Sequence, residues 1–131
     1  MIITAKDGLP YVTASLIYRS QMITLDKVLL DTGSAGTVFS SDRLLNIGVI
    51  ASPEDTVREL HGIGGSEFVF SRTVDVLTVG ELQVHSFEIE VGALLYGIDL
   101  DGIIGMDFLM QVSAVIDLGR LELRSAASTA S

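Results

Sequence analysis

The chain has no cysteine and few basic residues. Without cysteine there is no disulfide framework, no thiolate metal site and no cysteine nucleophile. Eight Lys and Arg residues against seventeen Asp and Glu residues give a net charge of −9. This charge argues against a nucleic-acid ligand, because phosphate contacts need a basic surface, and against an anionic membrane. Nor does any apolar run approach the roughly 20 residues of a membrane-spanning helix. We therefore expect neither a nucleic-acid nor a membrane partner.

The length and the first residues predict one domain in the cytoplasm. A chain of 131 residues that is 48% hydrophobic has enough material for the core of one domain. Residues 1–7 contain no basic region followed by a long apolar stretch, so no secretory signal is expected. The last residues, 125–131, contain only Ser, Ala and Thr. We expect a folded domain over residues 1–124 and a disordered tail over 125–131.

Short apolar segments, many of them alternating, run through most of the chain. Thirteen glycines but only two prolines separate them. Turns are expected at residues 19–21 and at Asp26-Lys27, and short helices at 41–47, capped by Ser40 or Ser41 and stopped by Gly48, and at 106–111. Strands spaced so closely leave no room for crossover helices, which indicates an antiparallel barrel or sandwich. The strands are expected over residues 9–18, 22–25, 28–30, 68–70, 74–79, 87–91, 114–117 and 121–123.

The sequence contains only incomplete matches to the common motifs for metal and dinucleotide binding. His61 and His85 lie far apart, with no third ligand at metal spacing. The segment Asp99–Gly102 begins like a calcium loop but continues with two isoleucines, where an oxygen ligand and a glycine are needed. The segment Gly62–Glu67 begins like a dinucleotide fingerprint but lacks the third glycine. We therefore expect no metal and no cofactor.

One carboxylate stands in a distinctive place. Asp31 directly follows the apolar segment Val28-Leu29-Leu30, and small residues come after it. Two carboxylates held close together can share a proton and act as base and acid around one water. The simpler interpretation is a strand that ends in an ordinary Asp-Thr-Gly turn.

The surroundings of Asp31 resemble the single-domain, retroviral-like aspartic proteases, the retropepsin family. Three elements occur in that family's order: Leu29-Leu30-Asp31-Thr32-Gly33-Ser34, the flap-like Gly62-Ile63-Gly64-Gly65, and Ile103-Ile104-Gly105 before a short helix. The continuation from Met106 to Leu109 is most similar to the cellular DNA-damage-inducible type and its bacterial relatives. The resemblance spans about residues 9 to 124.

The resemblance implies an all-β fold, a closed antiparallel β-barrel of the retropepsin type with a flap hairpin and one or two short helices. It implies that Asp31 is the catalytic carboxylate and that Thr32 points its hydroxyl across a two-fold axis. Gly33 would let the substrate approach the backbone. Ser34 would donate a hydrogen bond to Asp31, which stabilises the ionised carboxylate and predicts an acidic pH optimum.

The same resemblance assigns the remaining site residues. A glycine-rich flap would close over the substrate, although an ordinary glycine hairpin has the same pattern. Core packing is the alternative for the pocket positions Leu29 and Val38. The flap is assigned to Gly62, Ile63, Gly64 and Gly65; substrate binding to Leu29, Gly33, Ala35, Val38, Ile63 and Ile103; and support beneath the loop to Ile104 and Gly105.

One chain supplies only half of the catalytic pair. Asp101 and Asp107 flank the third motif, but neither is followed by Thr-Gly or Ser-Gly. The second carboxylate must therefore come from another copy, so a homodimer acting on a peptide or protein substrate is expected. The viral enzymes carry an arginine and an aspartate where Met106 and Ala35 stand here, so their interface arrangement is not expected. The alternative is a non-catalytic peptide-binding or dimerisation module with the same fold.

Overall fold

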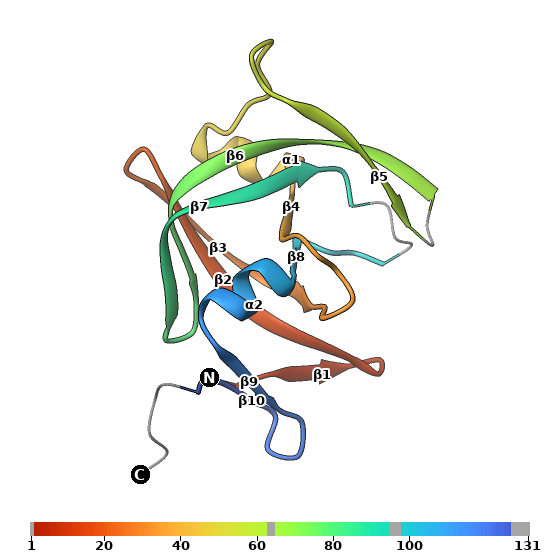
Figure 1. The fold of residues 1–131 in the computed structure, drawn as a ribbon, viewed down its shortest axis with the longest axis vertical. Helices are drawn as coiled ribbons and strands as arrows, with labels where there is room; N and C mark the ends of the chain where they lie inside the picture. Colours follow the sequence, from red (N-terminus) through yellow and green to blue (C-terminus); the bar gives the residue numbers. More distant parts are fainter. Residues whose placement is uncertain (1, 63–64, 95–97, 127–131) are drawn as a thin grey trace.

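The computed structural model describes residues 2–62, 65–94 and 98–126 (Figure 1). Strands dominate, and helices are few and short in this part of the chain. The elements are β1 (Thr4–Lys6), β2 (Leu9–Tyr18), β3 (Gln21–Leu30), β4 (Val38–Ser40), α1 (Ser41–Leu44), η1 (Leu45–Ile47), β5 (Val57–Gly62), β6 (Gly65–Val79), β7 (Leu82–Gly92), β8 (Gly102–Ile104), α2 (Met106–Gln111), β9 (Ala114–Asp117) and β10 (Glu122–Ser125).

Six strands close into a barrel. They follow the order β2-β3-β8-β4-β7-β6, and the pairing of β6 with β2 completes the circle. The predicted all-β barrel is confirmed. It is mixed rather than wholly antiparallel, because β8 runs parallel to β3 and β4 runs parallel to β7. Long connections join both of these pairs, so no hairpin forces their strands to run in opposite directions.

The predicted turn at Asp26-Lys27 is wrong. β3 is continuous, and its register against β2 shifts by one residue here: Val12 lies opposite Val28, whereas Ala14 lies opposite Leu25. The extra residue forms a β-bulge. Local composition misleads at this point because polar residues are as suitable for an exposed bulge as for a turn. Similarly, the predicted strands 68–70 and 74–79 are parts of the single strand β6.

The helix ends agree with their sequence signals. The Ser40 side chain accepts a hydrogen bond from the Arg43 N–H at 3.4 Å and caps α1. The chain then continues as the 3-10 helix η1 and ends at Gly48, whose φ of 80° lies in the left-handed region. The predicted helix at 106–111 is α2. No helix in the described residues is long and apolar enough to cross a membrane.

A single hydrophobic core holds the strands on either side of the Asp31 loop. Val28, Phe39 and Ile104 are fully buried in it, one from each of β3, β4 and β8. α2 closes the core through Phe108, whose ring meets the Phe87 ring edge to face at a centroid distance of 5.7 Å. The small sheet of β9 and β10 lies below α2, near β1 (Figure 1). The end of β3 and the short strands β4 and β8 are therefore anchored side by side where the Asp31 loop begins.

Candidate active site

Asp31 lies at the point where β3 leaves the barrel. The Asp31 N–H donates to the Ile104 carbonyl at 3.0 Å, which ties the start of the loop to β8. The Asp31 carboxylate Oδ1 accepts the Gly33 N–H at 2.9 Å, and the Asp31 carbonyl accepts the Ser34 N–H at 3.2 Å. The half-buried carboxylate is therefore oriented by its own loop, while Thr32 and Gly33 are exposed beside it.

The predicted hydrogen bond from Ser34 to Asp31 is wrong. The Ser34 hydroxyl donates instead to the Gly36 carbonyl at 2.7 Å. A hydroxyl has one proton to donate, so this bond closes the Ser-Ala-Gly turn rather than stabilising the carboxylate. The acidic pH optimum stays a prediction, without this hydrogen bond as its reason.

A buried threonine joins the loop to α2. Thr37 is fully buried, and its hydroxyl donates to Asp107 Oδ1 at 2.7 Å and accepts the Gly105 N–H at 3.1 Å. The Thr37 N–H donates to Asp107 Oδ2 at 3.2 Å. Sequence reasoning missed this pair, since a Thr and an Asp 70 positions apart carry no local sign of contact. Asp107 thus acts as a clamp: its carboxylate holds the end of the Asp31 loop, at Thr37, against the start of α2.

Replacing Thr37 by Val is expected to destabilise the protein by about 2 kcal/mol, because valine keeps the shape but leaves the Gly105 N–H without its acceptor. Urea denaturation of the two proteins measures the difference in the free energy of unfolding. Thr24→Val is the matched control: Thr24 is exposed on β3, so its change should stay within about 0.5 kcal/mol. Equal destabilisation by both substitutions would contradict the clamp.

Ile104 and Gly105 lie beneath the loop, where the resemblance assigns them. The Met106 N–H donates to the Ser34 carbonyl at 2.8 Å, and the Asp107 N–H donates to the Ala35 carbonyl at 3.2 Å. A Cβ atom on Gly105 would lie only 2.2 Å from the Gly36 carbonyl oxygen. The third sequence motif and the Asp-Thr-Gly loop are therefore in backbone contact, which leaves no room for a side chain between them.

The predicted pocket residues of three strands lie in one row. Leu29 on β3 is opposite Ile103 on β8, and Ile103 is opposite Val38 on β4. Because side chains alternate along a strand, these three point away from the core side chains that neighbour them. Ile103 and Val38 are 4% and 3% exposed yet stand outside the main core cluster, and Leu29 is partly exposed. The pocket role of Leu29 and Val38 stays a prediction beside the alternative of core packing, because Val38 is as buried as a core residue.

The residues predicted to form a flap fall at the end of the hairpin of β5 and β6. Gly62 pairs with Gly65 at its end, while Ile63 and Gly64 lie outside the described residues. Residues 65–68 of β6 pair with β5 alone, since the pairing with β7 begins only at Val69. The end of the hairpin therefore projects beyond the barrel (Figure 1).

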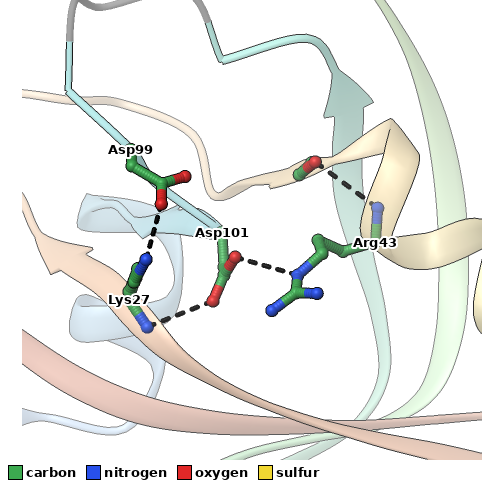
Figure 2. A network of polar contacts seen from close by, with 5 residues as sticks. Lys27, Arg43, Asp99 and Asp101 are labelled. Atoms are coloured by element: carbon green, nitrogen blue, oxygen red, sulfur yellow. Dashed lines mark hydrogen bonds and ion pairs between the residues drawn. The ribbon is translucent and has the colours of Figure 1, made fainter.

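Asp101 connects three elements that flank the row (Figure 2). Asp101 is only 5% exposed. Its carboxylate accepts hydrogen bonds from Arg43 Nε at 3.0 Å and from the backbone N–H of Lys27, in the β3 bulge, at 3.2 Å. Lys27 Nζ also contacts Asp99 at 2.5 Å; this hydrogen bond raises the pKa of Lys27 and lowers that of Asp99. Because both oxygens of the Asp101 carboxylate accept hydrogen bonds, this residue fixes the segment before β8 against β3 and α1.

An apolar hollow of about 280 Å³ opens beside Thr32. Met110 on its rim is 71% exposed. The hollow is formed by α2, the start of β9 and the active-site loop, and its lining is Thr32, Met106, Leu109, Met110, Ser113, Ala114 and Ile116. In the described residues, no group of three or more His, Cys, Asp or Glu side chains could hold a metal ion.

The sequence of this chain matches a family of known proteins. A family model described as aspartyl protease matches residues 24–108. The match runs from β3 through the Asp31 loop, the β5–β6 hairpin and β8 into α2. A search of curated proteins found no match for this chain. The matched segment contains all three sequence motifs.

Proposed function

Because the chain belongs to the aspartyl protease family, as the match over residues 24–108 establishes, we propose that it is a homodimeric endopeptidase. The observation that carries the proposal is a single Asp-Thr-Gly loop, oriented by its own backbone and open beside an apolar hollow. The resemblance to the retropepsin-like family is confirmed. The finer likeness to the DNA-damage-inducible type stays a prediction.

The chemistry needs a second carboxylate close to Asp31. Two such groups share one proton and hold a water between them. The ionised carboxylate takes a proton from this water as it attacks the scissile carbonyl carbon, and the protonated one stabilises the tetrahedral intermediate. The proton then passes to the leaving amine as the C–N bond breaks. Asp101 and Asp107 are engaged elsewhere in the same chain, so the second group is the Asp31 of another copy.

The hollow beside Thr32 is the surface on which the second copy would pack. It is apolar, it adjoins the loop that needs a partner, and Met106 stands in it where viral relatives carry an arginine. An isologous dimer places the same patch on both subunits and brings their loops together. A net charge of −9 on each subunit opposes this association, so dimerisation is favoured by salt and by acid.

Replacing Met110 by Lys is expected to shift the protein to monomers and to lower peptidase activity by at least about tenfold. At a two-fold interface the substitution places two charges in an apolar contact, each without a partner. Sedimentation velocity measures the association, and peptide cleavage at the same protein concentration measures the activity. Met22→Lys is the matched control, since Met22 is 66% exposed at the far end of β3. Unchanged association of Met110→Lys would exclude this surface.

The substrate would bind as an extended strand between the barrel and the flap hairpin. Leu29, Val38 and Ile103 would receive apolar side chains next to the scissile bond. The test is incubation with an unstructured protein between pH 4 and pH 6, with the new termini identified by mass spectrometry. Cleavage per chain should rise with protein concentration, because the active form needs two copies. Peptide binding without cleavage under every condition would overturn the endopeptidase.

A further inference from the structure

The pocket row continues into polar residues. Val38 is opposite Glu90 on β7, and Glu90 is opposite Ser71 on β6. One line of neighbouring side chains therefore crosses five strands, from Leu29 through Ile103 and Val38 to Glu90 and Ser71. Its first three members are apolar and its last two are polar. An apolar pocket alone does not account for this line.

Glu90 lies against the active-site loop. The Glu90 N–H donates to the Thr37 carbonyl at 2.9 Å, which joins β7 to the end of the loop. A Cβ atom on Gly36 would lie 3.8 Å from Glu90 Cγ, an ordinary packing distance. The Glu90 side chain is therefore beside Gly36, five positions after Asp31.

The Glu90 carboxylate holds an arginine of the flap hairpin. Its side chain is 13% exposed, and both oxygens are occupied: Oε1 by the Arg58 guanidinium and Oε2 by the Ser71 hydroxyl at 3.2 Å. Arg58, on β5, has a side chain that is 53% exposed. A guanidinium has five N–H donors, and in the described part of the chain Glu90 is the one polar partner found for that of Arg58. Each carboxylate oxygen of Glu90 thus has a partner within the protein, while the guanidinium of Arg58 keeps donors for a ligand.

We propose that Arg58, positioned by Glu90, selects a hydrogen-bond-accepting substrate side chain, Glu, Asp, Gln or Asn, near the apolar pocket. The proposal rests on the proposed function in one respect, the binding of an extended peptide over this row. A carboxylate or amide oxygen meets the donors left on Arg58 and forms charge-assisted hydrogen bonds. An apolar substrate side chain would displace water from the Arg58–Glu90 ion pair and offer no hydrogen bond in its place. A substrate lysine would be repelled by the positive charge of Arg58.

The experiment measures peptide binding by the Asp31→Asn protein, so that cleavage does not consume the ligand. A library keeps two apolar residues at the centre and places Glu, Gln, Leu or Lys at each flanking position. At one flanking position of the peptide, Glu or Gln should give at least about tenfold tighter binding than Leu. Lys at that position should give the weakest binding. Adding Arg58→Leu together with Glu90→Leu should remove this preference, and the paired change leaves no buried charge alone.

Two further variants separate the site from general effects of charge. Arg58→Lys should keep a weaker preference for Glu, because it preserves the charge but not the planar fork. Arg120→Leu, a control in the turn between β9 and β10, should bind like the parent protein. Equal binding of Glu, Gln and Leu peptides at every position, or a preference that survives the double substitution, would overturn the proposal. Selective binding by Asp31→Asn, together with no cleavage by the wild-type protein, would support this subsite while overturning the endopeptidase.

Discussion

Replacing Asp31 by Asn is expected to lower the rate of peptide cleavage by at least about a thousandfold. An amide neither accepts a proton from the attacking water nor returns one to the leaving amine. The substitution is nearly isosteric, and the Asn side-chain oxygen can still accept the Gly33 N–H that orients Asp31 at 2.9 Å. The loss should therefore be chemical rather than structural. The measurement is the cleavage rate of a peptide with an apolar centre between pH 4 and pH 6.

Mixing the two proteins tests whether the second carboxylate comes from another chain. An excess of Asp31→Asn protein added to wild type should suppress the activity below that of wild type alone, because mixed dimers contain one Asp31 rather than two. If a residue of the same chain completed the pair, the added protein would leave the wild-type rate unchanged. Asp42→Asn serves as the control: Asp42 is exposed on α1, and this variant should cleave like wild type. Equal cleavage by Asp31→Asn and wild type would refute the protease mechanism.

Replacing Gly105 by Ala should destabilise the protein by about 3 kcal/mol and remove most of its activity. The Gly105 φ of −101° is open to any residue, so the effect comes from space and not from backbone strain. The added Cβ would lie 2.2 Å from the Gly36 carbonyl oxygen and 2.8 Å from that of Ser34. Both obstacles are backbone atoms, so the loop itself must move away from β8. A displacement of about 1 Å at a catalytic group can cost roughly a hundredfold in rate.

Urea denaturation and the peptide cleavage rate report the two effects of Gly105→Ala separately. Gly119→Ala is the matched control, since its nearest neighbour, Asp117 Oδ1, would lie 3.5 Å from the new Cβ atom. That variant should keep the wild-type activity and change the free energy of unfolding by no more than about 0.5 kcal/mol. A Gly105→Ala protein as stable and active as wild type would show that the loop has room to move.

Much of the fold was predictable because its signals are local. Ser40 caps α1 and Gly48 ends the helical segment, as their residue types favour. The hairpin of β9 and β10 forms where alternating residues flank the glycine turn at 118–120. The place of Asp31, directly after an apolar strand, is likewise where the structure has it. In each case the chemistry of adjacent residues is sufficient.

The errors concern polar groups whose partners are distant in the chain. Asp26-Lys27 has the composition of a turn, but the backbone of Lys27 bonds to Asp101, 74 positions away, and the strand continues as a bulge. The family resemblance predicts a hydrogen bond from Ser34 to Asp31, yet the Ser34 hydroxyl donates to the Gly36 carbonyl. Thr37 and Asp107 carry no local sequence signal, and only the fold of the barrel brings them into hydrogen-bond contact. Nothing near them in the sequence specifies those partners.

By itself the sequence determined an acidic, all-β domain with one Asp-Thr-Gly, which is the basis for expecting a second copy. It could do so because strand alternation, helix caps and the count of catalytic motifs depend only on the order of residues. Only the tertiary structure decided what holds the Asp31 loop in place and which polar side chains continue the row of Leu29, Ile103 and Val38. Glu90 joins that row because β7 runs parallel to β4, and Arg58 joins Glu90 because β5 extends the same sheet. Register between strands distant in sequence is set by how the whole barrel closes, and one residue of slip would reverse every side chain in it.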